Sequence, residues 1–259
     1  MRKITVLFLL AFALAWAPVA HAQLSFDADF AQDMSYETSW PMKAGDIVSV
    51  DIYVSNVQAP GLISMGFKLT YDSSKLEVVE AGTAVDTANW PAPYLKTDIL
   101  GEIEMAGVRL GEGLTGLAGN NIRLGSVTFQ CSSEGTSAFM LLTRGESYMG
   151  FVLDCDEGTQ NCELLYDENR DPELLEQLLA ELVLDGDIGA GVLLATIRPP
   201  VAGNVNGDGS LDLADAILAL QFMAKMHQSY VHGNADANGD GVIGMQEAIY
   251  ILQSVSGLR

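Results

Sequence analysis

Two stretches of twelve residues near the C-terminus constrain this chain more than any other feature. The first runs from Asn204 to Asp215 (NVNGDGSLDLAD), and the second, which begins 32 residues later, runs from Asp236 to Glu247 (DANGDGVIGMQE). In loops of this pattern, oxygens at places one, three, five and twelve converge on one hard cation, place seven supplies a backbone carbonyl, and place six turns with positive φ. A solvated Asn/Gly turn would explain one such stretch, but not two that are each followed by an apolar helical pattern.

The second loop meets every requirement of the pattern, whereas the first departs from it at both ends. Asp236 opens the second loop, and Glu247 closes it with a side chain long enough for bidentate binding. In the first loop Asn204 replaces the opening acid, and Asp215, one methylene shorter than Glu, closes it. We therefore predict two bound Ca²⁺ ions, with the second loop the tighter site. The predicted ligands are Asn204, Asn206, Asp208, Ser210 (by its carbonyl), Asp212 (through water), Asp215, Asp236, Asn238, Asp240, Val242 (by its carbonyl) and Glu247.

An apolar helical pattern follows each loop. The apolar positions are Ala216, Ile217, Leu220, Met223 and Ala224 after the first loop, and Ala248, Ile249, Ile251 and Leu252 after the second. This pair of loop-plus-helix repeats, without an entering helix, resembles the dockerin family over roughly residues 203–258. The resemblance implies a small calcium-ordered helical module whose helix faces bind a cohesin. It places partner recognition at the tenth and eleventh loop positions, which here are Leu213, Ala214, Met245 and Gln246.

The N-terminus has the pattern of a secretion signal. Arg2 and Lys3 precede an apolar run from Ile4 to Val19, and residues 20–22 (AHA) form a small-x-small cleavage site. A retained membrane anchor is the alternative, but the apolar run is short for a span. We expect a signal peptide over residues 1–22 and a mature chain without a membrane span. The expected location is secreted, at the cell surface or periplasmic.

Acidic residues dominate the charge of the chain. It has 34 Asp and Glu against 13 Lys and Arg, a net charge of −21. Nucleic acid is therefore excluded as a partner, and cations such as Ca²⁺ are favoured.

Three cysteines have to be interpreted in an oxidising compartment. Cys155 and Cys162 flank the polar loop DEGTQN, and we predict that they close a small disulfide ring. Cys131 follows Val127 and Phe129 in a strand pattern, which indicates a buried thiol that behaves as a small hydrophobe. No CxxC or His pairing accompanies these cysteines, so we expect no metal site made by them.

From residue 24 to residue 198 the periodicity is that of strands. Between Val48 and Val54 apolar residues alternate with polar ones, and the pattern repeats from Ile63 to Tyr71 after a predicted Pro60-Gly61 turn. Further predicted strands are Leu76 to Glu80, Glu102 to Leu110, Ile122 to Cys131, Ala138 to Thr143, Tyr148 to Leu153 and Gly191 to Arg198. So many strands without intervening helices predict a mainly β fold, a β-sandwich of jelly-roll or Greek-key type.

Three segments of this region resemble a cohesin domain, the sandwich that receives dockerins. They are GFKLTYDSSKLEVVEAG from Gly66, GDIVSVDIYVSNV from Gly45 and LGSVTFQC from Leu124. Carbohydrate-binding modules share the same general fold, so glycan binding by the sandwich is the alternative. An exposed planar row of aromatic side chains would favour that alternative. The candidates are Trp40, Trp90, Tyr94 and Tyr148.

The acidic segment 154–187 departs from a cohesin pattern. Within it, residues 171–182 (DPELLEQLLAEL) predict a helix with Asp171 as N-cap, Pro172 at the first helical position and one leucine stripe. The stripe either packs on the sandwich or binds a partner. The predicted organisation is then a sandwich over residues 24–198, a short stiff linker at 199–202 and a dockerin module over 203–259.

No catalytic motif stands out from the sequence. Glycoside hydrolysis needs only two carboxylates, but nothing singles out one pair among so many acids, and neither a nucleophile elbow nor an HExxH motif is present. We expect an assembly protein rather than an enzyme, with cohesin- or dockerin-bearing partners. The two resemblances suggest extracellular polysaccharide-degrading complexes as its setting. The competing hypothesis is a polysaccharide-binding protein that its dockerin anchors to such a complex.

Overall fold

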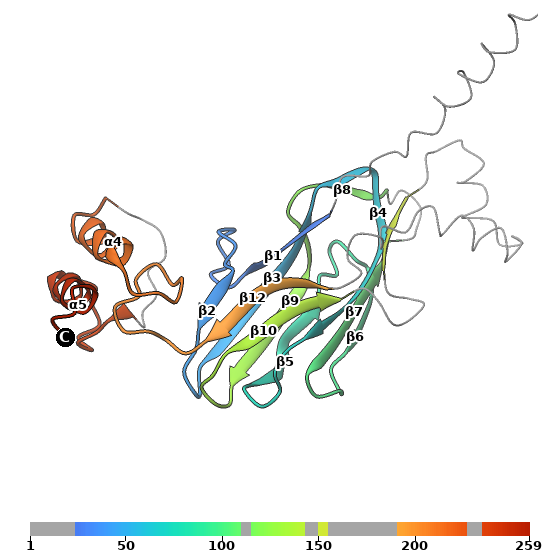
Figure 1. The fold of residues 1–259 in the computed structure, drawn as a ribbon. Coiled ribbons are helices and arrows are strands. Elements are labelled where there is room, and N and C mark those ends of the chain that lie inside the picture. The colour runs from blue at the N-terminus through green and yellow to red at the C-terminus, as the bar shows by residue number, and fades with distance from the viewer. Residues whose placement is uncertain (1–23, 110–114, 143–149, 155–190, 227–234) are drawn as a thin grey trace, which may run out of the picture.

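A computed structural model describes residues 24–109, 115–142, 150–154, 191–226 and 235–259 of the protein. Strands make up most of this part of the chain, and they form two sheets that pack face to face (Figure 1). The mainly β sandwich predicted from the alternation of residues is therefore confirmed.

The smaller sheet has four strands, and the larger has eight within the described residues. The smaller sheet, in spatial order, consists of β1 (Ser25–Asp29), β3 (Ile47–Ser55), β9 (Ile122–Cys131) and β5 (Leu76–Val85). The larger sheet consists of β2 (Ser39–Pro41), β12 (Val192–Arg198), β10 (Ser137–Leu142), β4 (Val57–Thr70), β7 (Glu102–Val108) and β6 (Ala92–Lys96). Two further strands, β8 (Leu117–Gly119) and β11 (Gly150–Leu153), pair with β4.

Alternate residues of the strands fill the space between the sheets. Val50 and Ile52 of β3 and Met65 and Phe67 of β4 are completely buried, as the period of two predicts. Cys131 belongs to the same core and is only 4% exposed, so the predicted buried thiol is confirmed.

The predicted Pro60-Gly61 turn is wrong, because β4 continues through both residues. The pairing of β4 with β8 shifts register between Val57 and Leu62, so these residues form a bulge within the strand. Gly61 has φ 98° and lies against Gly116, where an added Cβ would stand 2.5 Å from a backbone carbon. The chain instead passes from one sheet to the other at Asn56, which has φ 63°.

The sequence patterns do not indicate four of the strands, which are β1, β2, β6 and β8. The strands β2 and β6 lie at the two edges of the larger sheet, and each contains a proline. Proline is compatible with an edge strand because its missing N–H can face away from the ladder. The strand β5 also continues beyond the predicted end at Glu80 to Val85, through a register shift between Val79 and Ala84.

Two helices follow the calcium-type loops, α4 (Leu213–Met223) and α5 (Met245–Val255). They share a second, smaller core, which consists of Val205, Ala216, Ala219, Ala235, Ile243, Ala248 and Ile251. The predicted apolar face of each helix is therefore only partly buried. Ile217 of α4 and Ile249 of α5 are 56% and 47% exposed, because alanines rather than large side chains fill this core.

Several predictions fall outside the described residues. These are the signal peptide (1–22), the disulfide between Cys155 and Cys162, nearly all of the acidic segment with its helix at 171–182, and Tyr148. The described residues form two separate cores, one in the sandwich and one in the helical module, while the exact domain limits remain predictions.

Candidate calcium loops and docking surfaces

In the first loop, the closing residue organises the backbone and the opening residue supplies a spare oxygen. Asp215 is completely buried, and its Oδ1 accepts hydrogen bonds from the backbone N–H groups of Val205 (2.8 Å) and Asn206 (3.1 Å). Its Oδ2 accepts from the N–H of Asp212 (3.0 Å). Asn204 is 4% exposed, and its Oδ1 is buried without a hydrogen-bond partner.

In the second loop these roles are exchanged. Asp236 accepts hydrogen bonds from the N–H groups of Gly239 (2.7 Å) and Gly241 (2.6 Å), one on each oxygen. Backbone hydrogen bonds, chiefly that of Gly241, lower the pKa of Asp236. Glu247 is 1% exposed, and its Oε2 accepts from the N–H of Gly244 (2.7 Å). Its Oε1 is buried without a partner.

The middle of each loop makes the same turn. The N–H of Asp208 donates to Asn206 Oδ1 (2.9 Å), and the N–H of Ser210 donates to Asp208 Oδ1 (2.8 Å). Asp240 and Asn238 repeat the first of these bonds at 2.9 Å in the second loop. Both loops therefore have one backbone frame, set by their Asn-Gly-Asp-Gly segments.

Asp212, the predicted water-mediated ligand, has a structural role as well. It is the N-cap of α4, and its side chain accepts a hydrogen bond from the N–H of Ala214 (2.7 Å). An acid at this position favours the start of the helix through both the cap bond and the helix dipole. The first loop and its helix are thus joined through Asp212 as well as through Asp215, which lies within α4.

The donor set of each loop fits a calcium ion. An unpartnered oxygen buried away from water costs about 1–3 kcal/mol, and Asn204 Oδ1 and Glu247 Oε1 both stand in that position. A cation that prefers oxygen ligands, bound in each loop, would give both atoms a partner. The ligands predicted from the sequence would hold the ion in each loop. Calcium would neutralise the carboxylates and order the loop, and it would take no part in catalysis.

The sequence patterns do not indicate one further acidic cluster. Asp29, Asp33 and Glu37 have oxygens within 4.8 Å of one another. Asp29 is buried and accepts from the N–H groups of Asp33 (3.2 Å) and Met34 (2.8 Å), while Glu37 accepts from that of Phe30 (2.8 Å). These carboxylates hold the turn after β1, and we assign them that structural role.

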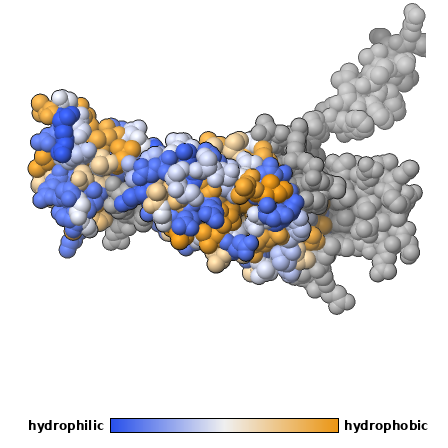
Figure 2. All heavy atoms as spheres, turned by 90° about the horizontal axis from the view of Figure 1, so that it is seen from below, coloured by the Kyte–Doolittle hydropathy of each residue, from blue (hydrophilic) through white to orange (hydrophobic). Residues whose placement is uncertain are grey.

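The helices carry a repeated stripe of exposed apolar side chains. Leu213, Ile217 and Leu220 on α4 are 56%, 56% and 43% exposed. Their counterparts 32 residues later, Met245, Ile249 and Leu252 on α5, are 52%, 47% and 46% exposed. The predicted partner residues Leu213, Ala214, Met245 and Gln246 are all exposed. Figure 2 shows exposed hydrophobic residues both on the helical module and on the sandwich.

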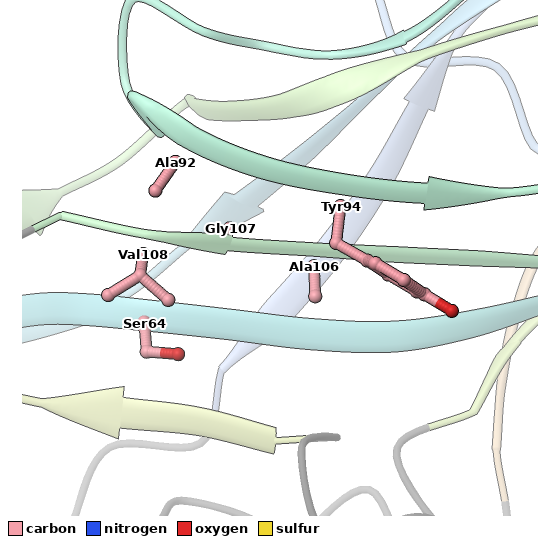
Figure 3. Close-up of a pocket in the computed structure, with 6 residues that line it drawn as sticks. All are labelled: Ser64, Ala92, Tyr94, Ala106, Gly107 and Val108. Carbon is pink, nitrogen blue, oxygen red and sulfur yellow. The ribbon is translucent and has the colours of Figure 1, made fainter.

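A shallow apolar groove of about 370 Å³ lies on the outer face of the larger sheet. Its lining residues are Ser64 of β4, Ala92 and Tyr94 of β6, and Ala106, Gly107 and Val108 of β7 (Figure 3). The register explains the groove: Ser64, Val108 and Ala92 stand in one row across the three strands. In the next row Tyr94 stands beside Ala106. Small side chains therefore form the floor, and the ring of Tyr94, 44% exposed, lies over it.

A row of charges borders the groove, and its members pair with one another. Glu104 is 4% exposed and lies between Lys68 (3.8 Å) and Lys96 (3.9 Å), its neighbours on the two adjacent strands. Lys68 also contacts Glu102 at 2.7 Å. This face of the sheet consequently offers an apolar surface whose nearby charges are already compensated.

The aromatic residues considered for glycan binding do not form a row. Trp40 is 8% exposed and stacks on Phe30 with ring centroids 5.3 Å apart. Trp90 is completely buried, and its indole N–H donates to the carbonyl of Arg123 (3.1 Å). Of the described candidates only Tyr94 is exposed, so the arrangement that would favour glycan is not present among them.

Comparison with known proteins identifies the sandwich. Residues 37–134 match the family described as Cohesin domain. This match, 98 of the 259 residues, lies within the sandwich and agrees with the resemblance that its strand motifs indicated. Cohesin domains are interaction modules without enzymatic activity, in agreement with the expectation that the protein is not an enzyme. The match ends before the helical module, whose resemblance to dockerins stays a prediction.

Solved structures that match include several cohesins. The solution structure of CaCohA2 from Clostridium acetobutylicum has 16% identity and a TM-score of 0.40, covering 69% of this chain and 92% of the other. The Coh-OlpC-Doc435 complex from Clostridium thermocellum, described as a type I cohesin–dockerin complex, has 21% identity and a TM-score of 0.37, covering 53% and 86%. The seventh ScaB type I cohesin from Pseudobacteroides cellulosolvens has 21% identity and a TM-score of 0.34, covering 44% and 73%. No curated protein matches the chain.

None of the helices in the described ranges is long and apolar enough to cross a membrane.

Proposed function

We propose that this protein is a secreted, calcium-dependent adaptor that joins other proteins through cohesin–dockerin contacts. The observation that carries the proposal is the open apolar groove on the outer face of the larger sheet, within the residues that match the cohesin family. A helix of a partner's dockerin would lie across β4, β7 and β6, where the small side chains permit close approach. A large apolar side chain of that helix would enter the groove beside Tyr94.

The C-terminal module is proposed to be the ligand in a second contact. Its two loops would bind calcium, and its exposed stripes on α4 and α5 would bind a cohesin of another protein. Each stripe has large apolar side chains that contribute little to the module's own core. Exposed apolar patches of this kind are typical of interaction surfaces.

We propose further that the module binds a different protein rather than another copy of this chain. The linker at 199–202 spans only about 13 Å when extended, so the module cannot readily reach the groove of its own sandwich. Contact with other copies would be head to tail, and the chains would assemble into an open filament unless they closed into a ring.

Extracellular polysaccharide-degrading complexes are the setting in which such an adaptor would act, with calcium at millimolar concentration.

Binding by the full-length mature protein to a panel of purified dockerin modules tests the receptor role. Ala106→Arg fills the groove with a long charged side chain and should lower affinity at least tenfold in calorimetry. Gln130→Arg, on the outer face of β9 in the other sheet, is the matched control and should leave affinity unchanged. Equal affinity of the two variants would refute the proposed surface, and displacement of the dockerin by oligosaccharides would favour glycan binding instead.

The module's role is tested by immobilised cohesins in the presence of calcium. Leu213→Asp combined with Met245→Asp places one charge in each stripe and should abolish capture. Gln221→Asp combined with Gln253→Asp places the same charges at the edge of each stripe, one turn after Ile217 and Ile249, and should weaken capture much less. Sedimentation in calcium should give the monomer mass, whereas a mass that rises with concentration would show self-association.

A further inference from the structure

The last strand of the sandwich contacts the first calcium-type loop through one side chain. Arg198 ends β12, and its guanidinium donates hydrogen bonds to the carbonyl oxygens of Gly207 and Asp208. The same group donates to Ser39 Oγ of the neighbouring strand β2 (2.7 Å). Ser39 Oγ in turn donates to the carbonyl of Gly207 (3.0 Å). Two adjacent strands thus hold one turn of the loop, which lies beside their ends in Figure 1.

This contact is packed rather than incidental. Arg198 is half-buried, its Nε is buried without a hydrogen-bond partner, and burial lowers its pKa. The guanidinium also lies directly against Gly209, where any added side chain would collide with it. A charged group accepts such desolvation only where fixed acceptors compensate it, and here the fixed acceptors are the two loop carbonyls.

Those carbonyls depend on the shape of the loop. Gly207 and Gly209 have φ of 73° and 90°, conformations that turn consecutive carbonyls outward. The predicted calcium ligands at this point are different atoms, the side chain of Asp208 and the carbonyl of Ser210. Arg198 and an ion would therefore bind different groups of the same turn, and each would favour the conformation that the other requires.

We propose that Arg198 and Ser39 form an interdomain clamp, which engages the first loop when calcium orders it and thereby fixes the helical module in one orientation on the sandwich. The clamp rests on the calcium binding of the proposed function. Its consequence is that calcium sets the direction in which the two apolar stripes are presented relative to the groove. By linkage, the clamp raises calcium affinity of the first loop by the factor with which calcium stabilises the clamp.

The distance between spin labels on the two parts of the full-length mature protein measures the clamp. Labels attached through Glu77→Cys on β5 and Gln253→Cys on α5, with Cys131→Ala, should give a narrow distance distribution in calcium and a broad one in EDTA. Arg198→Ala should leave the distribution broad in calcium while the calcium-dependent helical signal persists. Calorimetry of the same variant should show calcium affinity of the first loop lowered about threefold, the size expected for a partly exposed charged contact.

Arg109 offers a matched control. Its guanidinium also donates to two backbone carbonyls, those of Thr115 (2.8 Å) and Asn89 (2.9 Å), but both lie within the sandwich. Arg109→Ala should therefore keep the narrow distribution, and Ser39→Ala should broaden it less than Arg198→Ala does. A narrow distribution in Arg198→Ala, or a raised calcium affinity of its first loop, would refute the clamp alone. Helicity of the wild type that does not depend on calcium would refute the proposed calcium function and the clamp with it.

Discussion

The sandwich and the helical module are stabilised by different means. Large aromatic side chains such as Trp90, Phe67 and Phe129 are fully buried in the sandwich. In the module, four of the seven core residues are alanines, which remove little apolar surface from water. The module also buries oxygens of Asn204 and Glu247 that have no partner. The sandwich has a large core of its own, whereas the module has a small core and buried oxygens that the proposed ion would complete.

Removal of calcium should produce the largest difference in stability between the sandwich and the helical module. In EDTA the six acids of the two loops repel one another, and we expect the module to lose most of its helical signal. The sandwich should keep its thermal transition, because none of its core residues belongs to either calcium-type loop. Circular dichroism and scanning calorimetry on the same sample measure both effects, with magnesium as the control ion. A module that stays helical in EDTA would contradict the comparison.

Replacement of single ligands should then reveal different calcium affinities in the two loops. Glu247→Gln removes the charge of the buried spare oxygen but keeps an acceptor for the N–H of Gly244, so the helix can still start. We expect calcium affinity of the second loop to fall roughly tenfold or more. Asn204→Asp adds a charge at the corresponding spare oxygen of the first loop and should raise its affinity by less, about threefold. Calorimetry that finds the first loop to be the stronger site in the wild type would overturn this ranking.

The response to acid should be smaller and confined to low pH. Backbone hydrogen bonds, chiefly from Gly241, lower the pKa of Asp236 in the folded loop. A lowered pKa contributes stability that is present above the pKa of the unfolded chain and is lost as pH falls through the folded value. The second loop should therefore keep its turn down to the ordinary pKa of 3.8 and lose it below. Asp236→Asn should weaken this dependence in a helicity titration, whereas Asp98→Asn, on the sandwich, should leave it unchanged.

The smallest expected effect of calcium is on the reactivity of Cys131, which reports on the sandwich. Cys131 is 4% exposed, and burial raises the pKa of its thiol, so little of the reactive thiolate is present at neutral pH. Labelling of Cys131 by a thiol reagent, followed by peptide mass mapping, should be slow and equal in calcium and in EDTA. Guanidinium chloride should make it fast. Faster labelling in EDTA alone would mean that the sandwich also depends on calcium.

The sequence predicted the parts of this molecule that follow a period or a spacing. Strict alternation located β3, β4 and β9, and the order of oxygen-bearing residues located both loops. It could not show that Pro60 and Gly61 form a bulge, because the same two residues are typical of a turn and only the neighbour β8 decides between them. The edge strands β2 and β6 were missed for a related reason, since each contains a proline.

The candidate site shows the same division. The positions of the predicted partner residues follow from the loop pattern. The sequence does not show that the spare oxygen belongs to the opening residue, Asn204, in the first loop and to the closing residue, Glu247, in the second, since this depends on which oxygens the backbone N–H groups occupy. The groove was missed altogether, because Ser64, Ala92 and Ala106 are unremarkable in sequence and meet only through the register of three strands. Contacts between distant strands carry no local pattern.

The paired charges beside the groove determine how a complex on this face would respond to its surroundings. Glu104 already lies between Lys68 and Lys96, so a partner gains little by bringing charges of its own. Association would then depend on apolar surface removed from water, with a negative change in heat capacity and only slight sensitivity to ionic strength. Cooling would therefore weaken the affinity of such a complex more than high salt would.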